Sequence, residues 1–190
     1  MVLNKIKTAV FISGNGSNLK SLLIFSNRKS APIKINTIIS DNPKAKGLNF
    51  AKKYKIQSKI FNFKNQKKAE SQILKYLKKN SIDFICLAGF MKILSQEFIN
   101  NFGKKIINIH PSLLPKYKGL NTHERVIKKK EKYSGCTVHY VSHKVDSGKI
   151  ILQKKIKILK KDTPTTLAKK VLKQEHKIFP KAVKRIFSIR

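Results

Sequence analysis

Acidic residues are scarce in this chain of 190 residues: aspartate and glutamate number 9, against 43 lysines and arginines. The resulting formal net charge of +34 attracts anions, so nucleic acids and anionic small molecules are both candidate partners. Only four of the basic residues are arginines, whereas the arginine fork is the group that reads nucleic acid most specifically. We therefore expect no specific nucleic-acid partner and attribute the lysine excess to composition bias on solvated faces. A cluster of lysines around a phosphate-binding cleft is the alternative.

Cysteines and long apolar runs are also few. The two cysteines, Cys86 and Cys136, stand far apart in apolar or strand-like surroundings, which favours buried, reduced thiols over a disulfide or a metal pair. No apolar run is long enough to cross a bilayer, and residues 1–7 lack the pattern of a signal peptide. These absences predict a cytoplasmic protein with no membrane contact, and the length predicts a single domain over 1–190.

Short apolar runs alternate with amphipathic ones along much of the chain. The expected strands cover 8–12, 33–39, 58–63, 84–88 and 105–109, and the expected helices include 45–54, 66–79 and 122–132. This alternation predicts an α/β fold, a mainly parallel, Rossmann-like sheet with helices on both faces. Further strands over 135–141 and 150–159 predict an antiparallel C-terminal hairpin. Thr163 and Pro164 suit the N-cap and first residue of a last helix that carries Phe179 before Pro180.

A glycine-rich turn follows the first expected strand. Residues 13–18 read Ser-Gly-Asn-Gly-Ser-Asn, and Leu19, Leu22 and Leu23 then repeat at helical spacing. Strand, glycine-rich turn and helix in this order make a phosphate site, because glycines let the backbone approach the anion and free N–H groups face it. The full dinucleotide fingerprint lacks its third glycine, so an ordinary tight turn with Ser17 or Asn18 as helix N-cap is the alternative.

The stretch 106–119 carries the most informative polar pair. Asn108 and His110 stand two residues apart on an apolar strand that Pro111 ends, and side chains alternate along a strand, so both point to the same side. Ligands of open α/β sheets bind at such strand ends. Asp146, in a glycine-bearing loop, is the best carboxylate to orient the imidazole. A core histidine with a loop-capping aspartate is the alternative. No histidine pair has metal-ligand spacing, so we expect no metal.

Several motifs together resemble the folate-dependent formyltransferase family. They are residues 13–19, Leu87-Ala-Gly-Phe-Met-Lys-Ile-Leu-Ser95, Asn108-Ile-His-Pro-Ser-Leu-Leu-Pro-Lys-Tyr117, Asp146 and Gln174-Glu-His176. They occur in the right order and spacing over nearly the whole chain. The block that begins at Asn108 is shared by several formyltransferases, whereas the loop at 13–18 is similar to that of the members that formylate glycinamide ribonucleotide.

The resemblance implies the formyltransferase fold and transfer of a formyl group from 10-formyltetrahydrofolate, a cosubstrate, to the amine of glycinamide ribonucleotide in purine biosynthesis. The amine would attack the formyl carbon directly. Asn108 and protonated His110 would stabilise the oxyanion, and Asp146 would raise the pKa of His110 and organise a proton-shuttling water. The implied substrate contacts are Gly16, Ser17, Asn18 and Glu175, with Lys64 and Lys67 as candidates for the phosphate. The implied folate contacts are Phe90, Met91, Lys92, Ile93, Leu94, Asn108, Val141 and Asp146.

The same resemblance makes residues 1–100 the phosphate-binding half and 101–190 the catalytic and folate-site half of a monomer or homodimer. The chain also departs from the family pattern. Members often carry an arginine where this chain has Gln66, and commonly a histidine where it has Asn121. Methionyl-tRNA formylation and formylfolate hydrolysis would each bring an additional domain, and we expect neither. A nucleic-acid-binding module without activity is the non-enzyme alternative.

Overall fold

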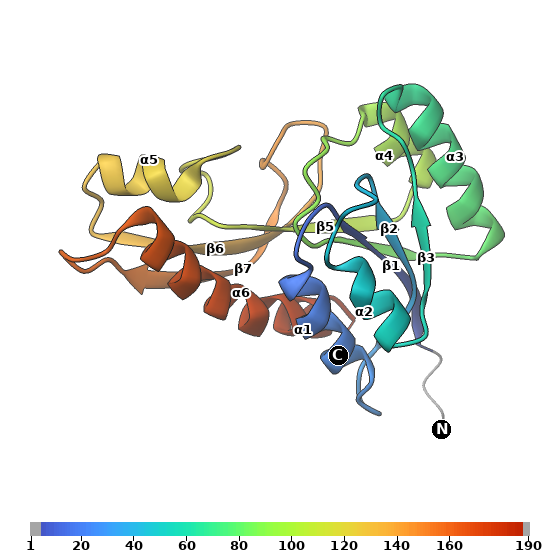
Figure 1. Ribbon diagram of the computed structural model, residues 1–190, viewed down its shortest axis with the longest axis horizontal. Coiled ribbons are helices and arrows are strands. Elements are labelled where there is room, and N and C mark those ends of the chain that lie inside the picture. The colour runs from blue at the N-terminus through green and yellow to red at the C-terminus, as the bar shows by residue number, and fades with distance from the viewer. Residues whose placement is uncertain (1–4, 188–190) are drawn as a thin grey trace.

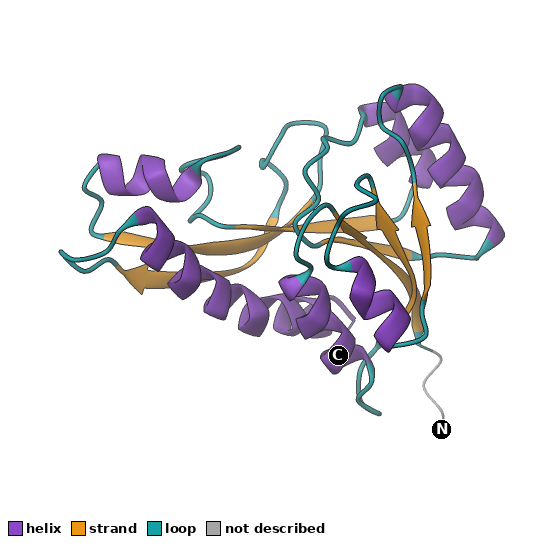
Figure 2. Ribbon diagram, in the orientation of Figure 1, coloured by secondary structure: helices purple, strands orange, loops and turns teal. Residues whose placement is uncertain are grey.

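The computed structural model describes residues 5–187, and within them seven strands form one sheet in the order β3-β2-β1-β4-β5-β6-β7 (Figures 1 and 2). The strands are β1 Ile6–Ile12, β2 Ile33–Ser40, β3 Gln57–Ile60, β4 Phe84–Leu87, β5 Lys105–His110, β6 Tyr133–Tyr140 and β7 Ile150–Lys157. Strands β1 to β5 pair in parallel, and β6 and β7 add to the sheet as an antiparallel hairpin. The predicted fold class is confirmed.

Helices cover both faces of this sheet. They are α1 Ser17–Ser26, α2 Leu48–Lys53, α3 Gln66–Lys79, α4 Gln96–Phe102, α5 Thr122–Lys128 and α6 Pro164–Phe187. Helices α3 and α4 pack on one face and the other four on the opposite face, where α1 and α6 lie side by side (Figure 1). In β1, Val10 and Ile12 belong to one apolar layer and Ala9 and Phe11 to the other. A strand buried on both faces needs such a continuous apolar run.

Most helix boundaries follow the expected local signals. The Ser95 side chain accepts a hydrogen bond from the Phe98 N–H at 3.0 Å, and the Thr163 hydroxyl accepts one from the Thr166 N–H at 3.2 Å. Both residues therefore cap a helix, as the sequence predicts for Thr163. The N-cap of α1, however, is Gly16 in a left-handed conformation with no side-chain cap, so the assignment of that role to Ser17 or Asn18 is wrong.

Other expected elements are shorter or longer than predicted. Helix α2 begins only at Leu48, because the Gly47 N–H bonds the Gly14 carbonyl of the glycine-rich loop at 2.9 Å. Helix α5 ends at Lys128, before a left-handed turn at Lys130. Helix α6 continues through Pro180 to Phe187, since its last turns still bury apolar side chains in the core.

The strand order places the candidate site. Strand β1 pairs with β2 on one side and β4 on the other, so the order reverses between β1 and β4. Ligands of open α/β sheets bind at this switch point, beyond the carboxyl ends of the strands. Ser13, directly after β1, donates its backbone N–H to the carbonyl of Gly89, directly after β4, at 3.0 Å. The glycine-rich loop and the segment that follows β4 therefore meet there.

Three further observations concern the described part of the chain. None of its helices combines the length and apolar character that a bilayer crossing needs. No three His, Cys, Asp or Glu side chains of residues 5–187 come together where they could hold a metal ion. Cys86 and Cys136 are buried and free, as expected, and burial raises the pKa of both thiols, to about 12 for Cys136.

Candidate active site

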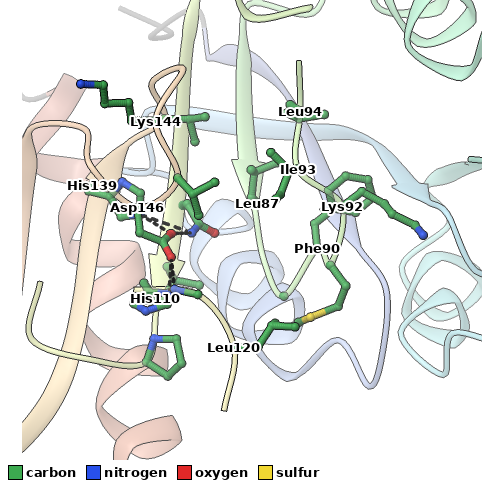
Figure 3. Close-up of a pocket in the computed structure, with 18 of the residues that line it drawn as sticks. Leu87, Phe90, Lys92, Ile93, Leu94, His110, Leu120, His139, Lys144 and Asp146 are labelled. Atoms are coloured by element: carbon green, nitrogen blue, oxygen red, sulfur yellow. Dashed lines mark hydrogen bonds and ion pairs between the residues drawn. The ribbon is translucent and has the colours of Figure 1, made fainter. Parts of the chain in front are cut away.

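A cavity of about 390 Å³ opens at the carboxyl ends of β4 and β5, under the loop that joins β6 to β7 (Figure 3). One side is formed by residues 89–94, which we call the pocket wall. All residues that the resemblance implies for folate line the cavity: Phe90, Met91, Lys92, Ile93, Leu94, Asn108, Val141 and Asp146. His110 lines it too. The implied substrate residues Gly16, Ser17, Asn18, Glu175, Lys64 and Lys67 lie outside this lining.

Asp146 is the point on which the polar side chains converge (Figure 3). Its Oδ2 accepts a hydrogen bond from the Gly119 N–H at 2.9 Å and lies 3.3 Å from Nδ1 of His110. Its Oδ1 lies 3.5 Å from both the Asn108 amide nitrogen and Nε2 of His139. Asn108 and His110 therefore face the same side of β5, as the period of a strand predicts. The Asp146 side chain is only 9% exposed, so these contacts are little screened by water.

The imidazole of His110 has an acceptor at each nitrogen. Nε2 lies 2.9 Å from the Tyr117 carbonyl, which can only accept, so Nε2 carries a proton. Nδ1 faces Asp146 and is the atom where a second proton would be gained or lost. The two groups can therefore hold one proton between them inside the cavity.

The protonation of this pair follows from opposing effects. Burial lowers the pKa of His110 below its ordinary value, although the Tyr117 carbonyl and Asp146 act to raise it. The expectation that Asp146 raises this pKa is thus right as to its direction, but burial outweighs it. Burial also disfavours ionised Asp146, yet hydrogen bonds from His139 and Gly119 and the nearby imidazoles hold the pKa of Asp146 below its usual range. A neutral imidazole beside a carboxylate results near neutral pH.

His139 belongs to this centre, and the sequence did not single it out. It stands directly opposite Asn108 in the antiparallel register of β5 and β6. Its Nε2 lies 3.3 Å from the Asn108 amide nitrogen, and its Nδ1 lies 2.8 Å from the Tyr140 carbonyl. The only signal in the sequence is its place on an alternating strand, which does not reveal the pairing register.

The glycine-rich loop lies against the start of α2. Gly16 has a φ of 71°, a left-handed value that glycine adopts freely. A Cβ atom added at Gly16 would lie 2.6 Å from the Cα of Gly47, so the two backbones touch with no room for a side chain. No side chain caps the start of α1, and uncapped amides at a helix start suit an anion.

Asn18 and Glu175 bring the first and last helices together beside this loop. The Asn18 amide donates to Oε2 of Glu175 at 2.6 Å, and both side chains are buried. Burial raises the pKa of Glu175, against the effect of the Asn18 hydrogen bond. The Asn18 amide oxygen is buried without a hydrogen-bond partner, so this cluster retains an unused acceptor.

The segment around Gln66 supports the pocket wall through Gln66 and leaves the neighbouring lysines in solvent. Lys64 and Lys67 are exposed. Gln66 turns instead to the pocket wall, where its amide donates to the Ile93 carbonyl at 2.8 Å and to Oε1 of Glu70 at 2.9 Å.

Comparison with known proteins decides the family. Residues 6–183 match the family described as "Formyl transferase". The chain belongs to this family. This formyl transferase is 41% identical over 181 residues to the phosphoribosylglycinamide formyltransferase of Haemophilus influenzae, which covers 94% of the chain and 85% of that relative. It is 41% identical over 187 residues to the human trifunctional purine biosynthetic protein adenosine-3, covering 97% of the chain but 18% of that relative.

A solved structure of the phosphoribosylglycinamide formyltransferase from Brucella melitensis superposes with a TM-score of 0.91 at 38% identity. The match covers 98% of the formyl transferase described here and 97% of that chain. The family that the sequence motifs indicate is therefore confirmed, and so is the fold that this family implies.

Proposed function

We propose that this formyl transferase moves the formyl group of 10-formyltetrahydrofolate to the amine of glycinamide ribonucleotide in purine biosynthesis. The products are formylglycinamide ribonucleotide and tetrahydrofolate. The observation that carries the proposal is the convergence of Asn108, His110 and Asp146 inside a cavity whose wall is bonded to the glycine-rich loop. The names of the bacterial relatives support the same reaction.

The cavity suits a donor with a flat apolar ring and a polar reacting end. Met91 and Ile93 leave 63% and 65% of their surface exposed at the wall, and the polar centre lies across the cavity from them. An apolar pocket with a few convergent polar groups is the usual form of a small-molecule site. When bound, the folate supplies the activated formyl carbon.

The chain's own residues would stabilise charge and move one proton. The Asn108 amide makes only long contacts, at 3.3 and 3.5 Å, so it is free to turn and donate to the formyl oxygen as negative charge develops there. The attacking amine must lose a proton, and the folate nitrogen must gain one when its bond to the formyl carbon breaks. The pair formed by Nδ1 of His110 and Oδ2 of Asp146 would take the first proton through a water and return one to the folate nitrogen.

His110 would also donate to the oxyanion once it is protonated. Both of its nitrogens face protein acceptors in this structure, so this role requires one contact, to Tyr117 or to Asp146, to open when the substrates bind. Hydrogen bonds of catalytic groups often tighten or rearrange only in the substrate complex.

The acceptor would bind beside the cavity, along the glycine-rich loop. Its phosphate would meet the loop at Gly16, Ser17 and the start of α1, where free amides and the positive end of the helix dipole favour an anion. Asn18 and Glu175 would contact its ribose or glycinamide end. Lys64 and Lys67 remain candidates for added charge near the phosphate. We expect a monomer or homodimer whose partners are these small molecules.

The direct test follows the loss of 10-formyltetrahydrofolate with and without glycinamide ribonucleotide. We expect consumption only when the ribonucleotide is present, with one formylated product formed for each donor consumed. Donor consumption that ignores the amine would instead identify a hydrolase, and transfer to methionyl-tRNA would identify a different acceptor; either result would overturn the proposal.

A further inference from the structure

The pocket wall has no regular secondary structure, and few hydrogen bonds hold its backbone. The Phe90 ring anchors it from inside, packed edge-on against Phe11 and Phe63 with centroid distances of 5.3 and 5.6 Å. The backbone of the wall is bonded to the rest of the protein near its two ends. One end is bonded to helix α3 and the other to the glycine-rich loop.

The far end of the wall is fixed to helix α3. Gln66 bonds the Ile93 carbonyl, and the Ser95 N–H donates to Oε1 of Glu70 at 2.8 Å. The Ser95 hydroxyl donates to the other oxygen of the same carboxylate. Glu70 is buried in α3, so this end is attached to the scaffold itself.

The near end of the wall is held by one residue of the glycine-rich loop. Ser13 donates its N–H to the Gly89 carbonyl at 3.0 Å, and its hydroxyl accepts from the Met91 N–H at 2.8 Å. The hydroxyl proton goes to Oδ1 of Asp41 at 2.6 Å, so the oxygen presents its lone pairs to Met91. One side chain thus joins the loop after β1 to the wall after β4.

The backbone of the glycine-rich loop is restrained on several sides, so a displacement at one of its residues is passed on to the others. The Asn42 amide bonds the Ser13 carbonyl at 3.1 Å, and the Gly47 N–H bonds the Gly14 carbonyl at 2.9 Å. Behind Gly16, the contact with Gly47 leaves no space into which the backbone can retreat. An anion that draws the loop amides toward itself will therefore move Ser13, and with it Met91.

We propose that Ser13 is a positioning residue that couples the two substrate sites: an acceptor phosphate on the glycine-rich loop strengthens binding of the formyl donor against the pocket wall. The proposal rests on the proposed function, because it assigns a phosphate to the loop and a folate to the cavity. Coupling is reciprocal, so the donor must strengthen acceptor binding by the same factor.

The test measures binding without turnover. Tetrahydrofolate has no formyl group to transfer, so its Kd can be measured by calorimetry with and without saturating glycinamide ribonucleotide. For the wild-type chain we expect the ribonucleotide to lower the Kd of tetrahydrofolate by a factor of about 5 or more. The reverse titration should give the same factor. A factor of one would overturn the proposal.

Ser13→Ala is the decisive variant, because it removes the hydroxyl and keeps the backbone bond to Gly89. We expect it to bind each ligand alone and to show a coupling factor near one, whereas Ser58→Ala, the same change on the exposed strand β3, keeps the wild-type factor. Wild-type coupling in Ser13→Ala overturns the proposal. If that variant does not fold, Ser13→Cys, whose sulfur is only a weak acceptor for the Met91 N–H, decides by the same criterion. If the two ligands bind with coupling but no formyl group is transferred, the proposed function is wrong and the coupling proposal still holds.

Discussion

The polar centre and the pocket wall face the same cavity, but different kinds of structure hold them. Asn108, His110 and His139 lie within the paired strands β5 and β6, and Asp146 reaches them from the loop that joins β6 to β7. The wall is an irregular segment that a few side chains of α3 and the glycine-rich loop keep in place. Proton transfer tolerates little displacement, whereas a bulky donor has to enter and leave. The rigid part of the site therefore serves chemistry and the looser part serves binding.

The largest loss of activity should come from a substitution in the polar centre. Asp146→Asn cannot share a proton with His110, so kcat should fall by about 100-fold or more, while both KM values change little. Steady-state formyl transfer measures this, and circular dichroism with a thermal melt checks folding. Asp83→Asn, an exposed acid paired with Lys104 at the opposite edge of the sheet, is the matched control with normal turnover. Undiminished turnover in Asp146→Asn would remove the proton relay.

A substitution among the side chains that hold the pocket wall should weaken binding of the formyl donor without slowing the chemical step. Every group that faces Glu70 is a donor, from Gln66 and from the backbone and hydroxyl of Ser95, so Glu70→Gln leaves at least one donor unpaired. Such a loss costs about 1–3 kcal/mol, and we expect the KM of the donor to rise roughly tenfold with kcat almost unchanged. Glu97→Gln, at an exposed position of α4, is the control. A fall in kcat of the same size would show that wall and centre are not separable.

A change at the acceptor site should have a smaller effect, on the KM of the acceptor and not on that of the donor. Glu175→Gln keeps the shape of the side chain but replaces the charged acceptor of the Asn18 amide with a neutral one. Charge-assisted hydrogen bonds are about twice as strong as neutral ones, so we expect the KM of glycinamide ribonucleotide to rise about threefold to tenfold. The KM of the donor, measured at saturating glycinamide ribonucleotide, should stay at its wild-type value. Equal changes in both constants would contradict the separation of the two sites.

The smallest effect concerns stability and pH. Burial lowers the pKa of His110 and His123 in the folded chain, so the unfolded chain binds more protons as pH falls through about 6.5. Stability should therefore decline between pH 7.5 and 5.5, and less steeply in His123→Gln than in the wild type. Ser13→Ala changes no titratable group and should keep the wild-type slope in thermal melts. An unchanged slope in His123→Gln would show that this histidine does not contribute.

Local patterns in the sequence predicted most of the scaffold and part of the site. Continuous apolar runs identified the buried strands because both faces of the sheet are covered. The two-residue spacing of Asn108 and His110 placed them on one side of β5, because the period of a strand does not depend on its neighbours. The order of strand, glycine-rich turn and helix predicted the loop after β1, and the strand order of the structure then places that loop at the switch point.

What the sequence could not predict depends on pairings across long separations. His139 joins the centre only through the register of β5 with β6. Glu70 supports Ser95 from 25 residues away. Gln66 bonds the Ile93 carbonyl of the wall, 27 residues away. The end of α6 could not be predicted because a proline such as Pro180 usually ends or kinks a helix. Here the helix continues, since core packing of its last turns outweighs the hydrogen bond that the proline removes.

The contact between Gly16 and Gly47 sets a limit for protein engineering. A methyl group at Gly47 would lie 2.6 Å from Cδ1 of Ile12 and 3.0 Å from the Cα of Gly16, so alanine there requires the Ile12 side chain and the glycine-rich loop to shift. Mutant libraries aimed at new acceptor molecules should therefore leave both glycines untouched and vary the exposed rim of the cavity instead.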